Sequence, residues 1–278
     1  MADMQRLIEQ ITSNDTKIRD QARAELVSMG SQAVEPLIAA LDSPSDWQRK
    51  SIVTLLQQIK DPRVPPALLK MLNDTDPYVR GFAAVALAEH GAQDAIPAIQ
   101  QMVETEREAF GRMYLLQALD KLGQREWVLQ YTTHIMRDDT FSNPDRQAAI
   151  QMLVRFNDPG TADLLLEAFQ KNEPGVGNNA LQGLKALKDG RIVDILIAQL
   201  HDPAPAKRAA AAVELGNLGD ERAVEPIKAL LGDKATAWTG DRPGEPSTSV
   251  GQAAQDALKK LRHSDSQPQA KKPRWKLW

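Results

Sequence analysis

The sequence contains no cysteine, only four histidines and only thirteen aromatic residues among 278. The lack of cysteine excludes disulfide bonds and thiolate metal sites, and it is typical of proteins in a reducing compartment. The four histidines are scattered, so none has the partner one helical turn away that a histidine metal site uses. No apolar run approaches the roughly 20 residues of a membrane span, and the N-terminus resembles an amphipathic helix rather than a signal peptide. We therefore expect a soluble, cytoplasmic protein.

A strong charge of one sign is also missing. The formal net charge is −3 at pH 7, which disfavours a general nucleic-acid binder. No nucleophile elbow or phosphate-binding loop is present. Gly175, Gly177 and Ala180 have the spacing of a dinucleotide fingerprint, but no strand precedes them and they open a helix. We expect no catalytic residues, no metal and no cofactor, and an enzyme is the less favoured interpretation.

What the sequence does contain is a repeated helical hairpin, seen most clearly at residues 206–231. There a helix-forming run ends at Gly219, and Pro226 lies in the first turn of a second helix. An arginine followed seven residues later by a leucine marks six first helices, and in two more a glycine replaces the arginine; the starts are 30 to 34 residues apart, and 43 apart at the last step. The pairs are Arg19/Leu26, Arg49/Leu56, Arg80/Leu87, Arg112/Leu119, Arg146/Leu153, Gly177/Leu184, Arg208/Leu215 and Gly251/Leu258.

This period predicts an all-α fold, a right-handed α-solenoid (superhelix) of about eight two-helix repeats. We expect the solenoid over residues 1–262, with irregular units at 93–170 and a loop insertion at 232–249. Residues 263–278 should be a disordered basic-aromatic tail. First helices are expected on the convex side and second helices on the concave side, where exposed positions such as Lys70 and Gln101 would line a groove.

Several first helices are preceded by a polar residue and a proline, which predicts an N-cap followed by proline at the first helical position. These pairs are Ser43–Pro44, Asp76–Pro77, Asn143–Pro144 and Asp202–Pro203.

The repeated arginines Arg19, Arg49, Arg80, Arg112, Arg146 and Arg208 have two interpretations. The first is structural, and we favour it because the arginines follow the register of the fold. Each would pair with an acid of the adjoining turn, such as Asp46, Asp74, Asp76 or Asp202, forming a ladder. The second interpretation is that the arginines bind an anionic ligand.

Aromatic residues supply the candidate partner-binding sites. Seven of the thirteen lie between Phe110 and Phe169, where they either fill gaps between irregular units or contact a partner together with arginines. From this region we nominate Trp127, Tyr131 and Arg137. From the insertion and the tail we add the following residues: Trp238, Arg242 and Trp275.

The hairpins resemble HEAT-like repeats of the phycobilisome-lyase type. The resemblance rests on D-T-D-P-Y-V-R-G-F-A-A-V-A-L-A-E-H-G at 74–91, on G-S-Q-A-V-E-P-L-I-A-A-L at 30–41 and on G-D-E-R-A-V-E-P-I-K-A-L-L at 219–231, and it covers roughly residues 1–262. It implies the solenoid fold. It leaves the activity open, because the family includes bilin lyases, chaperone-like relatives and scaffolds.

Three functions follow as hypotheses. The first is a non-catalytic protein–protein interaction scaffold or assembly chaperone that binds another protein in the concave groove. The second, implied by the resemblance, is a bilin lyase or lyase-partner subunit acting on phycobiliproteins, with a bilin held in the groove. In the third, residues 271–278 tether the solenoid to a membrane or to nucleic acid.

Overall fold

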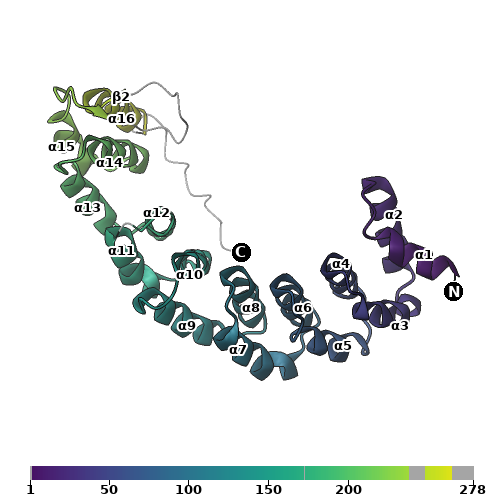
Figure 1. Ribbon diagram of the computed structural model, residues 1–278. Helices are drawn as coiled ribbons and strands as arrows, with labels where there is room; N and C mark the ends of the chain where they lie inside the picture. Colours follow the sequence, from purple (N-terminus) through teal and green to yellow (C-terminus); the bar gives the residue numbers. More distant parts are fainter. Residues whose placement is uncertain (1, 172, 238–247, 265–278) are drawn as a thin grey trace, which may run out of the picture. The chain divides into compact units, whose positions relative to one another are not determined.

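The computed structural model describes residues 2–171, 173–237 and 248–264. The chain divides into two compact units, residues 1–180 and residues 181–278, and each unit is described by itself. Helices dominate both units (Figure 1), which confirms the all-α class predicted from the repeat.

The first unit consists of helix pairs preceded by one short helix, α1 (Ala2–Gln10). The pairs are α2 (Thr16–Ser28) with α3 (Ser31–Ala39), α4 (Asp46–Leu56) with α5 (Val64–Met71), α6 (Pro77–Glu89) with α7 (Ile96–Thr105), α8 (Ala109–Lys121) with α9 (Arg125–Arg137), and α10 (Asn143–Phe156) with α11 (Ala162–Lys171). Helix α12 (Val176–Leu187) crosses the boundary between the units.

The second unit continues the pattern and ends it with an unpaired helix. It contains α13 (Arg191–Gln199), α14 (Pro205–Leu218), α15 (Val224–Lys228), strands β1 (Thr236–Ala237) and β2 (Thr248–Ser249), and α16 (Val250–Ser264). Within the described residues the chain therefore forms seven helix pairs, and the eighth unit has only its first helix. Four 3-10 turns precede or extend second helices: η1 (Ala40–Asp42), η2 (Gln93–Ala95), η3 (Pro159–Thr161) and η4 (Glu221–Ala223).

The two helices of a pair occupy different rows of the stack. Within residues 1–180, Figure 1 shows α4, α6, α8 and α10 as an inner row and α5, α7, α9 and α11 as an outer row. The expectation that second helices line the concave side is therefore wrong for this unit. The sequence pattern could not decide the point, because both helices of a pair have one buried stripe and the curvature depends on how closely neighbouring helices approach.

The core of each repeat contains the leucine used to recognise it. Leu26, Leu56, Leu87, Leu119, Leu153, Leu184 and Leu215 are buried completely, and Leu258 is 8% exposed. These leucines occupy the same register of successive first helices. Burying a leucine contributes about 1.5–3 kcal/mol relative to leaving it exposed, which makes the repeated leucine the main apolar contribution shared by all units.

Two glycines mark places where neighbouring first helices approach closely. A Cβ added at Gly81 in α6 would lie 2.8 Å from the Cβ of Tyr114 in α8, and one added at Gly216 in α14 would lie 2.7 Å from the Cα of Ala257 in α16. Each glycine is therefore needed for space rather than for backbone flexibility.

The predicted helix starts agree with the structure at one of four positions. Asp76 caps α6 and Pro77 opens it, as predicted. Helix α4 is capped by Ser45 instead of Ser43, α10 by Ser142 instead of Asn143, and α14 begins at Pro205 after Ala204. The physical reason is visible at Ser43 and Asp202, because their side chains accept the backbone N–H two residues further on and form a turn before the helix starts.

The insertion predicted at 232–249 begins and ends in a short antiparallel ladder. Thr236 pairs with Ser249 and Ala237 with Thr248, and the amides of Val250 and Gly251 donate hydrogen bonds to the carbonyls of Ala235 and Asp233. The two ends of the insertion are thereby held together at the start of α16. Residues 238–247 and the tail from 265 to 278 lie outside the described residues.

Candidate functional site

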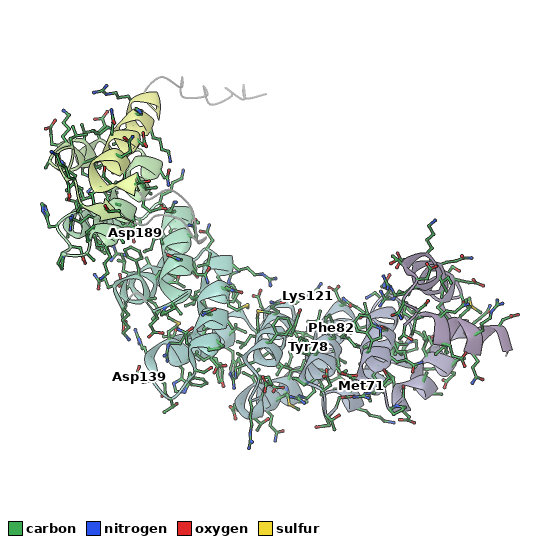
Figure 2. The ribbon with its side chains drawn as sticks, turned by 45° about the horizontal axis from the view of Figure 1, so that its top comes forward. Met71, Tyr78, Phe82, Lys121, Asp139 and Asp189 are labelled. Atoms are coloured by element: carbon green, nitrogen blue, oxygen red, sulfur yellow. The ribbon has the colours of Figure 1, made fainter. Side chains whose placement is uncertain are left out.

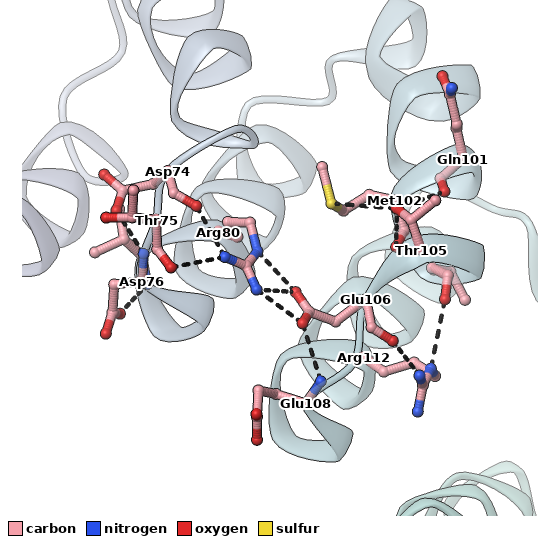
Figure 3. A network of polar contacts seen from close by, with 12 residues as sticks. Asp74, Thr75, Asp76, Arg80, Gln101, Met102, Thr105, Glu106, Glu108 and Arg112 are labelled. Atoms are coloured by element: carbon pink, nitrogen blue, oxygen red, sulfur yellow. Dashed lines mark hydrogen bonds and ion pairs between the residues drawn. The ribbon is translucent and has the colours of Figure 1, made fainter. Parts of the chain in front are cut away.

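The repeated arginines connect successive repeats. Arg49 donates two hydrogen bonds of 2.7 Å to the carboxylate of Asp74, at the start of the next repeat. Arg80 pairs in the same way with Glu106 at 2.7 Å, and Arg208 pairs with Asp233 at 2.8 Å. Each arginine also donates to a carbonyl in the turn before its own helix, as Arg80 does to Asp74 at 2.8 Å. Figure 3 shows how Asp74, Arg80 and Glu106 form one continuous network.

The acid of this ladder lies six residues before the arginine of its own repeat. At that position Asp74 accepts the N–H of Asp76 at 2.9 Å, and Glu106 accepts the N–H of Glu108 at 3.0 Å. Burial raises the pKa of Asp74, but the hydrogen bonds from Arg49 and from its own turn outweigh this and hold the pKa below its ordinary value. The N–H of Ala235 and the guanidinium of Arg208 likewise lower the pKa of Asp233. The carboxylates of Asp74 and Asp233 are therefore ionised and hydrogen-bonded within the fold.

The ladder is irregular where the sequence predicts irregular units. Arg112 pairs with Asp145, which lies inside α10, and it also donates to the carbonyl of Glu106. Both side chains of the Arg112–Asp145 pair are less than 10% exposed. Arg146 pairs with Glu173 at 2.7 Å.

One arginine and one acid of the ladder stand apart. Arg19 has only its neighbour Asp20, at 3.8 Å, as an ion-pair partner within the described residues. The equivalent acid position in the next repeat is Ser43. Asp202 lies 25 residues after Gly177, where the repeat lacks its arginine, and it pairs with Lys207 at 3.4 Å.

A second set of ion pairs, which sequence reasoning missed, connects the turns inside the hairpins. Arg63 pairs with Asp61 at 2.7 Å and with Glu35 of the preceding repeat at 3.1 Å. Arg222 pairs with Asp220 and with Asp194 of the preceding repeat, both at 2.9 Å. The signal was present as the triplets Asp-x-Arg at 61–63, 189–191 and 220–222.

Two of the nominated residues of the irregular region, Trp127 and Tyr131, contact each other on α9. Trp127 and Tyr131 stack with ring centroids 5.2 Å apart and planes within 9°, and the Tyr131 hydroxyl donates to the Val103 carbonyl at 3.3 Å. Burial raises the pKa of Tyr131. Phe141 lies between the ring of Tyr131, 6.5 Å away, and the guanidinium of Arg112, 5.5 Å away.

Three of the nominated partner-binding residues lie in the described part of the chain, and the structure brings two of these together. Trp127 and Tyr131 are partly buried and stack on each other, while Arg137 is exposed and lines a separate open hollow with Asp158. Trp238, Arg242 and Trp275 lie outside the described residues. Their role in partner binding stays a prediction.

A different row of aromatic residues is exposed on the first helices of repeats two to four. Trp47 in α4, Tyr78 in α6 and Phe110 in α8 are 48%, 43% and 44% exposed. The rings of Tyr78 and Phe110 are 4.9 Å apart. Phe110 continues the row to Tyr114 at 4.8 Å, and Tyr114 to Phe82 at 5.1 Å. We call this row, Trp47, Tyr78, Phe82, Phe110 and Tyr114, the aromatic stripe.

The aromatic stripe follows the repeat. Trp47, Tyr78 and Phe110 each lie two residues before the repeat arginine, so their side chains take the same position on adjacent helices. Sequence reasoning missed the stripe because it weighed the aromatics by their density along the chain and not by register. The signal that would have found it was an aromatic at the same distance from the arginine in three consecutive units. Figure 2 shows Phe82 on the inner side of the first unit and Asp139 on the outer side.

A lysine lies within the stripe. The ammonium group of Lys50 is 4.3 Å from the ring centre of Trp47 and 5.7 Å from that of Tyr78. Lys50 makes no ion pair with any described residue. Its ammonium group therefore makes cation–π contacts with two rings and can still form an ion pair with a bound partner.

The described part of the chain holds no cluster of three or more residues that could bind a metal ion. None of its helices has the length and apolar character needed to cross a membrane.

Successive helix pairs, several of them linked by equivalent ion pairs, define an α-solenoid. A family model for HEAT repeats matches residues 4–78, 65–143 and 164–239. These matches cover most of the chain, so the chain belongs to the HEAT repeat family, as the resemblance implied.

Known proteins similar to this chain include one related to bilin metabolism. The bilin biosynthesis protein RpcF from Synechococcus sp. (strain WH8020) is 32% identical over 126 residues, which cover 45% of this chain and 56% of RpcF. The chain thus spans about half the length of this curated relative.

Solved structures share the fold at low sequence identity. The Escherichia coli protein YibA matches with a TM-score of 0.54 at 20% identity, covering 93% of this chain and 92% of YibA. Kap121p in its complex with Nup53p matches with a TM-score of 0.53 at 12% identity, covering 93% of this chain and 37% of Kap121p. These two likenesses concern the solenoid architecture alone.

Proposed function

We propose that this chain is a protein-binding HEAT solenoid, a scaffold or assembly chaperone, which holds its partner against the first helices of repeats two to four. The observation that carries the proposal is the aromatic stripe, because contiguous exposed aromatic side chains are enriched at protein interfaces and rare elsewhere on soluble surfaces. The ion-pair ladder beneath the stripe supports the proposal, since it fixes the helices that carry the rings and so lowers the entropy lost on binding.

The size of the stripe suits an anchor. A fully exposed aromatic side chain has an area of about 150–250 Å², so the partly exposed side chains of Trp47, Tyr78 and Phe110 together expose roughly 250 Å². Covering that area at ~25 cal/mol/Å² would contribute about 6 kcal/mol to binding. Association itself costs about 4–15 kcal/mol. The stripe can therefore provide the central contacts of an interface, while polar contacts around it must provide the remaining affinity.

The test compares crosslinking from the inner and outer rows. A photo-crosslinking phenylalanine derivative replaces Tyr78 in one variant and Lys70, exposed on α5, in the other. We expect an extract of the source cells to give a crosslinked species of discrete mass from position 78 and not from position 70. Mass spectrometry identifies the partner, and its Kd is then measured with purified proteins. The double variant Tyr78→Ser with Phe110→Ser should raise this Kd at least tenfold. Equal crosslinking from both positions, or none from position 78, would contradict the proposal.

The identity with RpcF favours a second candidate, a bilin lyase or lyase-partner subunit. Under it the bound protein would be a phycobiliprotein and a bilin would be handled during the interaction. Mixing the purified chain with a free bilin, with and without an apophycobiliprotein, distinguishes the two. A new absorbance band or covalently attached bilin supports the second candidate. Binding of the apoprotein without a spectral change supports a scaffold.

A further inference from the structure

In the first helices of repeats one and two, Arg23 of α2 and Lys50 of α4 make no ion pair with a carboxylate among the described residues. The Nε atom of Arg23 is buried and has no hydrogen-bond partner. Arg23 lines an open hollow together with Thr54 and Gln58 of α4. Thr54 lies one turn beyond Lys50, and its hydroxyl donates to the Lys50 carbonyl at 2.9 Å.

On α4, Lys50 lies between the stripe residue Trp47 and Thr54, which lines the hollow of Arg23. Trp47, Lys50 and Thr54 lie on one face of α4, at the spacing of successive helical turns. The spacings from Trp47 to Lys50, from Lys50 to Tyr78 and from Tyr78 to Phe110 are 4.3, 5.7 and 4.9 Å. Lys50 therefore connects the rings of α4, α6 and α8 into one surface, and the hollow lined by Arg23 of α2 lies next to this surface along α4.

Acidic residues bound the stripe on its other edge. Asp46, Asp76 and Glu108 lie one or two residues before the aromatic residue of their helices, at the helix N-termini. Asp76 is engaged in capping α6. The carboxylates of a ligand would be repelled from this edge and attracted toward Lys50 and Arg23. The charges around the stripe therefore favour a negatively charged ligand and also fix its orientation on the stripe.

We propose that the stripe binds an acidic amphipathic segment of a partner protein, with apolar side chains on Tyr78 and Phe110 and carboxylates on Lys50 and Arg23. The inference rests on the proposed protein-binding function and names the chemistry of the partner. Burial would strengthen the contact between a carboxylate and Lys50, because the rings around Lys50 exclude water. A nucleic-acid strand fits less well, since it would bring many phosphates to a surface with two open cations and an acidic edge.

The experiment uses the full chain and two fluorescent peptides of about fifteen residues. Both have leucines on one helical face, and the first has four glutamates flanking that face where the second has glutamines. Fluorescence anisotropy should show the glutamate peptide binding at least tenfold more tightly than the glutamine peptide, with the difference shrinking in high salt. The Lys50→Glu variant should bind the glutamate peptide at least tenfold more weakly than the wild-type chain does. Lys70→Glu, the matched change on α5, should alter binding less than twofold.

The remaining outcomes overturn the inference. Equal affinity for both peptides, or an unchanged affinity in Lys50→Glu, rejects the acidic ligand and leaves an apolar docking face. If the glutamate peptide does not bind, the inference of an acidic ligand is also rejected. The proposed protein-binding function is still supported in that case if position 78 crosslinks a protein. Tighter binding of an oligothymidine of about twenty nucleotides than of the glutamate peptide would replace the protein ligand by a nucleic acid.

Discussion

The two units use different side chains at the same register of their first helices. In residues 1–180 the positions two before and two after the repeat arginine hold Tyr78 and Phe82 in α6, and in residues 181–278 the equivalent positions of α14 hold Ala206 and Ala210. Aromatic rings at these positions contact one another across α6 and α8 and remain partly exposed. The alanine side chains of α14 are too small to form an exposed aromatic surface for a partner. The difference teaches that the repeat sets where a side chain lies, while its size decides whether the position can bind a partner.

The Arg112–Asp145 pair of the first unit is more buried than the Arg208–Asp233 pair of the second, and this difference should have the largest effect on stability. Replacing Arg112 with Leu would leave the Asp145 carboxylate buried without its charge partner, at an expected cost of about 3–5 kcal/mol. Arg208→Leu, which removes the partner of the more exposed Asp233, should cost about 1 kcal/mol or less. Urea unfolding midpoints of the two variants measure the difference. The double variant Arg112→Met with Asp145→Leu should recover most of the loss, and equal effects at both sites would show that burial is not what distinguishes the pairs.

Close approach of helices should have the next largest effect. Alanine at Gly216 would meet the backbone of α16, so we expect Gly216→Ala to destabilise the chain by about 1–3 kcal/mol although alanine favours helices. Gly81→Ala should cost less, because the obstructing atom belongs to the Tyr114 side chain. Thermal unfolding provides the measurement, with Gly232→Ala as the control, since nothing lies within 4 Å of that position. A Gly216→Ala variant as stable as the wild type would refute the tight contact.

Acid should weaken both units through their ladder carboxylates. The pKa values of Asp74 and Asp233 are depressed in the folded chain, whereas in the unfolded chain an aspartate titrates near ~3.9. Below about pH 4 the unfolded state therefore binds more protons, and the free energy of unfolding falls as the pH falls. Asp74→Asn should lower the melting temperature at pH 7 and flatten its decline between pH 5 and pH 3. Asp94→Asn, an exposed change outside the ladder, should keep the wild-type profile, and the same profile in Asp74→Asn would exclude this linkage.

The smallest expected effect is a gain. Ser43 occupies the acid position opposite Arg19, and its hydroxyl already accepts the N–H of Ser45 at 3.2 Å. Ser43→Asp should keep that turn and add an ion pair with Arg19, which would stabilise the first repeat by about 0.5 kcal/mol. Ser43→Asn preserves the turn without the charge, so a salt-sensitive gain in melting temperature should occur only with aspartate. A gain of equal size in both variants would assign it to the turn.

The fold could be predicted from the sequence much further than the candidate site. The spacing of the arginine–leucine pairs located every first helix from α2 to α16, because one buried leucine per hairpin is a local requirement that each repeat must meet. Trp127 and Tyr131 were nominated by aromatic density and stack on each other in a partly buried position, and their role in binding stays a prediction. Exposure depends on neighbours contributed by other repeats, which a linear count does not include.

The sequence by itself determined the period, the helical hairpin, the leucine core and the arginine that marks most of the repeats, since these follow from residue type and spacing within one repeat. Only the tertiary structure decided which helices form the inner row of the first unit, which acid each arginine meets, and that three rings and a lysine from successive repeats share one surface. Those features depend on the distance between side chains about 30 residues apart in sequence, and that distance exists only once the repeats have stacked.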